Sequence, residues 1–286
     1  MPRQKRVITI QDISCIGKCS LTVALPILSA AGIETSILPT AILSTHTGGF
    51  SGYTFRDLTE DVEPIAAHWK TLDIAVDAIY TGYLGSEEQL ALVQRFFAEF
   101  RQQDTVILVD PAMADQGKLY PAFDTEFALG MRDLCTHANI IAPNITEATL
   151  MLEKPYPGDE YNQAYIEQLL RELAELGPRY VVLTGISFEA GKLGAAAYDR
   201  ELDRFDYAFS EKVEGYYHGT GDIYSSALLA ALLNNKTLAQ AIQVAVDFTV
   251  GAIRRTREAA TDPKFGVDFE HELGNLIKLV GQKNAD

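Results

Sequence analysis

The sequence predicts an α/β protein whose central sheet is mostly parallel and covered by helices on both faces. Short β-branched runs recur along the 286-residue chain, and segments of helical periodicity separate them. Strands that alternate with helices are joined by right-handed crossovers, which make the strands parallel. The runs are rich in β-branched and apolar residues, as expected for strands that are buried on both faces. No repeat or Pro/Gly-rich linker divides the chain, so we expect one domain over residues 1–286.

Six apolar runs bounded by turn or polar residues are expected to be the buried strands. In chain order they are residues 7–10, 35–38, 78–81, 106–109, 140–142 and 181–184. Helical periodicity is found at residues 21–31, 87–100, 161–176, 223–233 and 238–255. Two further runs, residues 195–198 and 205–209, flank a charged stretch and predict a hairpin that extends the sheet.

The charge balance argues against polyanionic partners. The chain has 39 acidic residues against 24 Lys and Arg, so its formal net charge is −15. An acidic protein repels nucleic-acid phosphates and anionic lipid, so neither nucleic acid nor a membrane surface is expected as a partner. The three cysteines are too few for a disulfide framework at this length, which is typical of a reducing compartment.

No segment predicts secretion or membrane insertion. The apolar run at residues 7–10 is too short for the hydrophobic region of a signal peptide. The longest apolar stretches, residues 228–233 and 241–253, fall well below the roughly 20 apolar residues that span a bilayer. We therefore expect a cytoplasmic protein.

Polar or glycine-bearing residues follow nearly every predicted strand. In an open α/β sheet, ligands bind beyond the carboxyl ends of the strands, so these positions are the expected site. In chain order they are Gln11-Asp12, residues 45–49, Thr81-Gly82-Tyr83, Asp110-Pro111, Asn144 with Glu147, and Thr184-Gly185.

A glycine-rich entrance, His218-Gly219-Thr220-Gly221-Asp222, directly precedes a predicted helix of mainly small residues. Glycines at a helix entrance let free backbone N–H groups converge on an anion such as phosphate. Asp222 has two alternative roles there. It caps the helix, which its residue type alone favours, or it is a base that takes the proton of an attacking hydroxyl.

Two acidic residues at strand ends, Asp110 and Glu147, are candidate magnesium ligands. Carboxylates are hard oxygen donors that suit Mg²⁺, which keeps several waters and bridges substrate phosphates. The structural alternatives stay open at this point: Glu147 complements a helix dipole, and Asp110-Pro111 forms a turn.

Residues 44–56, which read STHTGGFSGYTFR, are expected to form a mobile lid between a strand and a helix. His46 within this lid is expected to form loop hydrogen bonds and is assigned no catalytic role. No P-loop sequence is present, and no Gly-x-Gly-x-x-Gly follows the first strand, which weakens Walker-type and dinucleotide interpretations. The cysteines and histidines lack the ligand spacing of a transition-metal site.

Taken as an ordered set, these motifs resemble the vitamin B6 kinases of the ribokinase-like superfamily, above all the pyridoxal and pyridoxamine kinases. The resemblance covers nearly the whole chain. It rests on Thr9-Ile10-Gln11, His46-Thr47-Gly48, Thr81-Gly82-Tyr83-Leu84-Gly85, Asp110-Pro111 with Asp115 and Gly117, Ala142-Pro143-Asn144 with Glu147-Ala148, Thr184, and Gly219-Thr220-Gly221-Asp222.

The resemblance implies a three-layer α/β/α ribokinase-like fold, usually found as a homodimer. The implied reaction transfers the γ-phosphoryl group of ATP to the 5′-hydroxymethyl group of a vitamin B6 pyridine. Asp222 would be the base, and the backbone of Gly219, Thr220 and Gly221 would form the anion hole. Phosphoryl transfer needs mainly positioning and charge stabilisation, so these parts and a metal ion suffice.

The resemblance also implies the binding residues. Mg²⁺ and the triphosphate of ATP would be organised by Asp110, Asn144 and Glu147, and Thr184 would lie near the nucleotide. The vitamin pocket would be lined by Asp12, Thr47 and Tyr83. A monovalent cation is a further candidate cofactor.

Asp12 departs from the resemblance, because many vitamin B6 kinases carry Ser at this position. A carboxylate there favours a protonated ring nitrogen or a substrate ammonium, so we expect a preference for pyridoxamine over pyridoxal. Related hydroxymethylpyrimidine kinases place an aspartate near this point, which keeps that activity as an alternative, although they often carry Cys where this chain has Asp222. A non-catalytic nucleotide- or vitamin-binding relative is the other alternative. The aromatic lid favours a flat heteroaromatic ring over a sugar.

Overall fold

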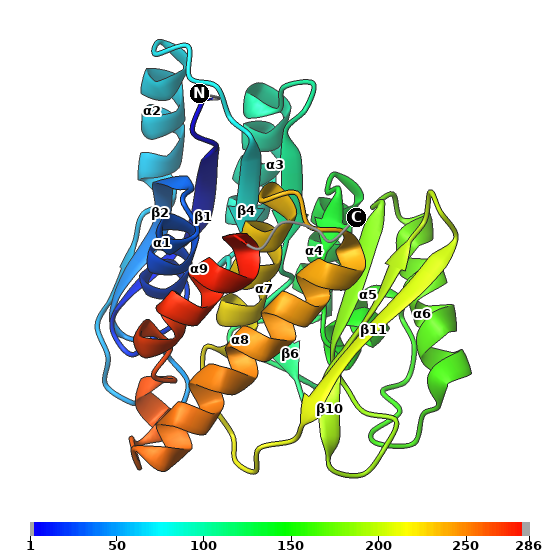
Figure 1. The fold of residues 1–286 in the computed structure, drawn as a ribbon. Coiled ribbons are helices and arrows are strands. Elements are labelled where there is room, and N and C mark those ends of the chain that lie inside the picture. The colour runs from blue at the N-terminus through cyan, green and yellow to red at the C-terminus, as the bar shows by residue number, and fades with distance from the viewer. Residues whose placement is uncertain (1–2, 282–286) are drawn as a thin grey trace.

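The computed structural model describes residues 3–281, which form a nine-stranded sheet between two layers of helices (Figure 1). The strand order is β11-β10-β9-β8-β5-β4-β1-β2-β3. All pairs from β9 to β2 are parallel, whereas β3, β10 and β11 pair antiparallel at the two edges. The expected mostly parallel sheet is confirmed.

The strands have the following bounds: β1 (Arg6–Ile16), β2 (Glu34–Thr45), β3 (Phe55–Asp57), β4 (Ala78–Thr81), β5 (Val106–Val109), β8 (Ile140–Ile141), β9 (Tyr180–Ile186), β10 (Lys192–Asp199) and β11 (Arg204–Glu211). A separate small hairpin is formed by β6 (Ala114–Asp115) and β7 (Lys118–Leu119). Every predicted strand is present, and the runs at 78–81 and 106–109 coincide with β4 and β5.

The helices divide between the two faces of the sheet, each over its own apolar core. One face carries α2 (Thr59–Lys70), α3 (Glu87–Phe100), α4 (Thr125–Thr136), α5 (Ile145–Met151) and α6 (Gln163–Glu175). The other face carries α1 (Leu21–Ala30), α7 (Thr220–Leu233), α8 (Leu238–Glu258) and α9 (Leu273–Gly281). Two 3₁₀ turns, η1 (Pro263–Phe265) and η2 (Glu270–Glu272), connect α8 with α9.

Helix α7 is the central element of its layer, because it packs on the sheet between α1 and α8. Nearly all of its side chains from Ile223 onward are buried, and most are Ala, Leu or Ser. A helix that is apolar all round is stable only when it is surrounded by protein. Small side chains let it approach the sheet closely, which places its N-terminus at the carboxyl edge of the parallel strands.

The lid prediction needs a correction. Residues 44–56 do not form one irregular connection, because β2 continues to Thr45 and β3 pairs antiparallel with it, with Leu43 opposite Phe55. The segment is therefore the end of a β-hairpin, and only residues 46–54 lie outside the strands. Its Thr and aromatic residues favour cross-strand pairing, whereas its three glycines are typical of an irregular loop.

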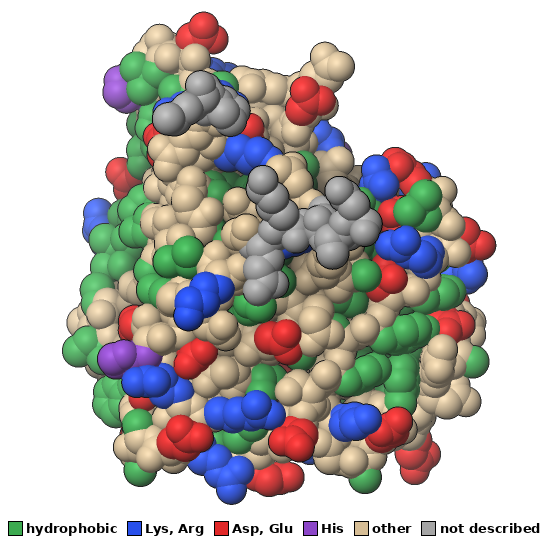
Figure 2. Space-filling view, in the orientation of Figure 1, with side chains coloured by type: hydrophobic (Ala, Val, Ile, Leu, Met, Phe, Trp, Pro, Cys, Tyr) green, Lys and Arg blue, Asp and Glu red, His purple; other side chains and the backbone are tan. Residues whose placement is uncertain are grey.

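Figure 2 shows acidic and basic side chains interspersed on the face that carries α8 and α9. Among residues 3–281, no helix is both long enough and apolar enough to cross a membrane.

Candidate functional site

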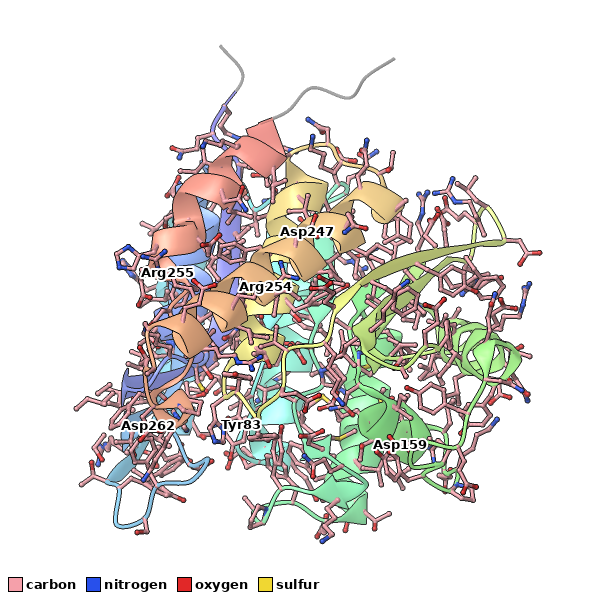
Figure 3. All side chains as sticks on the ribbon, turned by 60° about the horizontal axis from the view of Figure 1, so that its bottom comes forward. Tyr83, Asp159, Asp247, Arg254, Arg255 and Asp262 are labelled. Carbon is pink, nitrogen blue, oxygen red and sulfur yellow. The ribbon has the colours of Figure 1, made fainter. Side chains whose placement is uncertain are left out.

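The predicted site residues lie at one edge of the sheet, where the parallel strands end. This edge faces downward in Figure 1 and is turned forward in Figure 3, in which Tyr83 lies between Asp262 and Asp159. The residues that follow or end a strand are Asp12 on β1, Tyr83 after β4, Asp110 after β5, Asn144 and Glu147 after β8, and Thr184 on β9. Helix α7 brings Gly219 to Asp222 to the same edge.

Asp222 is not the cap of α7. The helix begins at Thr220, three residues earlier than predicted, so that Gly219 is the N-cap residue, with a φ of 75° and no capping side chain. Asp222 lies in the first turn, and its Oδ2 accepts a hydrogen bond of 2.9 Å from the backbone N–H of Ser20, at the start of α1. The capping interpretation, which the residue type favoured, is therefore wrong.

The backbone around Asp222 is held in unusual conformations. Ser20 has a φ of 52°, a left-handed value that is uncommon for a residue other than glycine. Gly219 lies so close to the preceding loop that a Cβ would be 2.0 Å from the carbonyl oxygen of Lys18. These two features fix the carboxylate of Asp222 beside the free N–H groups of the first helical turn. Local strain of this kind is found at functional sites.

The electrostatic environment of Asp222 favours the protonated form. Burial raises the pKa of Asp222 to about 7, and the negative charges of Asp110 and Asp12 contribute, while the hydrogen bond from Ser20 acts in the opposite direction. A carboxylate that titrates near neutral pH is well matched to accept a proton from a hydroxyl group.

Glu147 forms a complete capping box with Asn144, so the structural alternative for this residue is confirmed. Glu147 Oε2 accepts from the backbone N–H of Asn144 at 2.9 Å, and Asn144 Oδ1 accepts from the N–H of Glu147 at 2.9 Å. Glu147 Oε1 accepts from the N–H of Met113 at 3.2 Å, and Asn144 Nδ2 donates to the carbonyl of Ala114 at 2.8 Å. The box therefore ties α5 to the loop after β5.

Two of the predicted nucleotide-side residues are direct neighbours. Thr184 pairs with Asn144 through a parallel β-bridge, and its backbone N–H donates to the carbonyl of Pro143 at 3.0 Å. The chain of contacts and charges thus runs along the edge from Thr184 through Asn144 and Glu147 to Asp110 and Asp222.

The carboxylates of Asp110 and Glu147 form a buried pair of like charge. Burial raises the pKa of Glu147 well above its usual value, and the charge of Asp110 raises it further. Burial also raises the pKa of Asp110, against the hydrogen bond that its Oδ2 accepts from Ser225 at 2.7 Å. A hard divalent cation relieves such repulsion, and oxygen donors of this kind suit Mg²⁺. Within residues 3–281, no group of three or more His, Cys, Asp or Glu forms a metal cluster.

Asp12 lies near both Asp222 and Tyr83, because its charge raises the pKa of each of them. Asp12 is 4% exposed, and its Oδ2 accepts a hydrogen bond of 2.9 Å from Ser14. Burial raises the pKa of Asp12, and its negative charge is felt by Tyr83, whose ring packs against Phe123 with centroids 5.4 Å apart. These two residues are therefore brought together, whereas Thr47 is exposed in the lid.

His46 links residues 46–54, between β2 and β3, to the C-terminal part of the chain. Its Nδ1 accepts from the backbone N–H of Gly48 at 3.1 Å, and its Nε2 lies 2.8 Å from the carbonyl oxygen of Lys264. The ring is therefore neutral with its proton on Nε2, and burial lowers its pKa. This agrees with the predicted role in loop hydrogen bonding. The ring also packs on His218, with centroids 5.0 Å apart.

An open hollow of about 370 Å³ adjoins the acidic pair beside the β6–β7 hairpin. It is lined by Asp115, Tyr120 and Tyr216, among others, and Tyr216 donates to Asp115 Oδ2 at 3.2 Å. Tyr120 feels the charge of Glu147 and of Asp110, so the hollow is next to the candidate metal ligands.

Three supporting residues were not predicted from the sequence. The backbone N–H of Ser20 donates to the carboxylate of Asp222, and the hydroxyl group of Ser225 donates to that of Asp110. The carbonyl oxygen of Lys264 accepts a hydrogen bond from His46 Nε2. For Ser225 a signal existed, because a polar side chain three residues after Asp222 lies on the same face of a helix. Lys264 carried no such signal, because its contribution is a backbone carbonyl.

Comparison with known proteins agrees with this geometry. A pyridoxine/pyridoxal/pyridoxamine kinase of Bordetella avium is 28% identical over 88% of this chain and 86% of its own length. A crystal structure from Bacteroides thetaiotaomicron, of a protein assigned as a phosphomethylpyrimidine kinase in a form with pyridoxal, is 38% identical, covers 96% of each chain and has a TM-score of 0.91. Pyridoxal kinase from Lactobacillus plantarum has a TM-score of 0.88 at 28% identity and covers 97% of this chain and 98% of its own. The expected three-layer fold is thus shared with pyridoxal kinases.

The match to a protein family is also extensive. The sequence matches the family described as phosphomethylpyrimidine kinase over residues 28–265, which includes most of the strands and the first turn of α7. This range is more than half of the chain, and the chain therefore belongs to the phosphomethylpyrimidine kinase family.

Proposed function

We propose that this protein transfers the γ-phosphoryl group of ATP to the 5′-hydroxymethyl group of a vitamin B6 vitamer: pyridoxamine, pyridoxal or pyridoxine. The observation that carries the proposal is the position of Asp222. It is a carboxylate with a raised pKa in the first turn of α7, with no capping role, beside free backbone N–H groups. The names of the Bordetella avium and Lactobacillus plantarum relatives and the pyridoxal form of the Bacteroides thetaiotaomicron structure support it.

The proposed mechanism uses the residues at this edge as follows. Asp222 accepts the proton of the substrate hydroxyl as its oxygen attacks the γ-phosphorus, and ADP leaves. The N–H groups of Gly219, Thr220 and Gly221 stabilise the transferring phosphoryl group, because the first donors of a helix lack intrahelical partners and face the anion with the positive end of the dipole. Such transfer depends mainly on positioning and charge stabilisation.

The donor set fits Mg²⁺, because buried hard oxygens of like charge lie where the triphosphate would enter. Asp110 would hold the ion, and Glu147, whose oxygens already accept backbone hydrogen bonds, would contribute mainly its charge. When bound, Mg²⁺ neutralises charge on the phosphates. Asn144 and Thr184 would lie toward the nucleotide. A monovalent cation remains a proposal from the resemblance.

A pH dependence follows from the raised pKa of Asp222. A protonated carboxyl group cannot accept the hydroxyl proton, so activity requires the ionised form. We expect kcat/KM to fall about tenfold per pH unit below about pH 7, where the free enzyme protonates Asp222. The check is a pH profile of kcat/KM from pH 5.5 to 9 with a buffer-independent assay. A flat profile between pH 5.5 and 7 would argue against Asp222 as the base.

Asp12 is the proposed determinant of vitamer preference. A buried carboxylate among Ser14, Tyr83 and Asp222 provides a charge-assisted partner for the ammonium group of pyridoxamine, which the aldehyde of pyridoxal lacks. We expect Asp12→Ser to lower the ratio of kcat/KM for pyridoxamine to that for pyridoxal by about tenfold. Asp12→Asn, which keeps the shape, should lower the ratio similarly. Equal ratios in the wild type and both variants would remove this role.

Hydroxymethylpyrimidine kinase activity is the second candidate, and the description of the matched family favours it. An aminopyrimidine also presents nitrogen atoms to the Asp12 carboxylate. The deciding experiment measures ATP consumption and the phosphorylated product with pyridoxal, pyridoxamine, pyridoxine and hydroxymethylpyrimidine, with and without Mg²⁺. Turnover of the pyridines supports the main proposal, turnover of the pyrimidine alone supports the alternative, and turnover of none with intact nucleotide binding supports a non-catalytic binding protein.

We propose one kinase domain over residues 1–286, because both edges of the sheet belong to the same nine-stranded array. A homodimer is supported by the exposed apolar side chains of Ile42 and Phe55, which lie on β2 and on the edge strand β3. A cytoplasmic location is supported by the free state of the cysteines.

A further inference from the structure

Asp110 has one hydrogen-bonded and one free carboxylate oxygen. Its Oδ2 accepts the hydroxyl proton of Ser225 at 2.7 Å, and both residues are buried, with 7% and 1% of their surface exposed. Within residues 3–281, Oδ1 accepts no hydrogen bond. One oxygen of Asp110 is therefore occupied by the protein, and the other is left for a ligand.

Helix α7 carries both the hydroxyl group of Ser225 and the proposed base, Asp222. Asp222 and Ser225 are three residues apart and lie on the same face of the helix. The charge of Asp110 also raises the pKa of Asp222, so the two carboxylates lie close enough to interact. A carboxylate in this crowded acidic region needs a neutral donor to fix its orientation, because no Lys or Arg forms an ion pair with Asp110 among the described residues.

We propose that Ser225 is a positioning residue for the divalent cation: its hydroxyl group holds Asp110 Oδ2 and thereby presents Oδ1 to Mg²⁺. The inference rests on the proposed function and extends it to a residue on α7 that does not itself touch the cation. Outer partners of metal-binding carboxylates commonly contribute about 10- to 100-fold in metal affinity.

The neighbouring serine provides a matched control. Ser226 lies next to Ser225 in the same helix and is 0% exposed, but its hydroxyl group forms no hydrogen bond with a carboxylate among the described residues. Ser225→Ala and Ser226→Ala remove the same atom from the same buried helix. Only the first of them removes a donor from a carboxylate.

The experiment measures binding of Mn²⁺, a paramagnetic substitute for Mg²⁺, to the full chain in the presence of ADP, from the electron paramagnetic resonance signal of free Mn²⁺. We expect Ser225→Ala to raise the Mn²⁺ dissociation constant by about 10- to 100-fold, whereas Ser226→Ala binds like the wild type. Turnover of Ser225→Ala should recover in excess Mg²⁺, which a general packing defect would not show. If Ser225→Ala fails to fold, the same measurement is made on Ser225→Cys, whose side chain has a similar size but is only a weak hydrogen-bond donor.

Wild-type affinity in Ser225→Ala or Ser225→Cys, or an equal loss in Ser226→Ala, would overturn the proposal, as would a wild type that binds no Mn²⁺ with ADP. Failure of the proposed function looks different. In that case the wild type binds Mn²⁺ with ADP, and the Ser225 variants lose affinity, but no vitamer is phosphorylated.

Discussion

Asp222→Asn should lower kcat by about 10²–10⁴-fold and leave the KM for ATP nearly unchanged, because it removes the proton acceptor but keeps the shape of the side chain. Asparagine Oδ1 can still accept the hydrogen bond that Asp222 receives from the N–H of Ser20, so the first turn of α7 should stay in place. Steady-state kinetics with the best vitamer, at saturating and at varied ATP, measures both constants.

The control for Asp222→Asn is thermal stability as a function of pH. The pKa of Asp222, about 7 in the folded state, lies above the ordinary carboxyl value of 3.8, so the folded state binds the proton more tightly. The associated stability is present at low pH and is lost as the pH rises through about 7. Asparagine needs no proton, so the variant should melt a few degrees above the wild type at pH 8 and lose this advantage toward pH 4. Near-normal turnover would contradict the role of Asp222.

Gly219→Ala should lower kcat/KM for ATP by about 100-fold or more. The new Cβ would lie 2.0 Å from the carbonyl oxygen of Lys18 and 3.4 Å from Sγ of Cys19, and the φ of 75° disfavours any side chain. The clash is with the backbone of Lys18, which cannot move without a large cost in free energy. The loop before α1 and the start of α7 must therefore separate. This displaces the anion hole and the N–H of Ser20 from Asp222, and a shift of about 1 Å at a reacting centre costs about 100-fold.

Gly32→Ala is the matched control for the conformational part of that effect. Gly32 has a φ of 82°, close to that of Gly219, but a Cβ there would meet nothing within 4 Å. We expect a loss of about 1–2 kcal/mol of stability with full activity. Equal loss of activity in both variants would show that strain alone explains the result, and full activity in Gly219→Ala would contradict the close contact with Lys18.

The fold could be predicted where burial dictates the pattern. Residues 78–81 and 106–109 lie in the centre of the sheet, so their side chains are mostly apolar on both faces and the limits of the strands are plain in the sequence. The ends of β1 and β2 could not be predicted in this way. β1 continues beyond its apolar run through the buried polar residues Gln11, Asp12 and Ser14 to Ile16, so the apolar pattern marks only its first half.

The site could be predicted as an edge but not as a set of contacts. Strand ends identify the edge, because parallel strands share their carboxyl side. The pairing of Asp222 with Ser20 joins residues 202 positions apart, and that of Asp110 with Ser225 joins residues 115 apart. Such pairs depend on how α7 packs on the sheet, and no local pattern specifies that.

The residue types of Asp222 and Glu147, at the starts of α7 and α5, suggest roles that the structure does not give them. Asp222 is of a residue type that commonly caps helices, but it is not the cap of α7, because Gly219 is the N-cap residue. The residue type of Glu147 suits a metal ligand, but its side chain completes a capping box with Asn144. Asn144 followed by Glu147 is the spacing that signals such a box, so this contact was visible in the sequence.

The proposed role of Asp222 is tested most directly by a crystal structure of the protein with pyridoxamine and a non-hydrolysable ATP analogue. We expect a carboxylate oxygen of Asp222 to lie about 2.6–3.2 Å from the 5′-hydroxyl oxygen. We also expect the γ-phosphate to accept hydrogen bonds from the N–H groups of Gly219, Thr220 or Gly221. A ternary complex in which the Asp222 carboxylate points away from the hydroxyl group, or in which the phosphate lies elsewhere, would contradict this proposal.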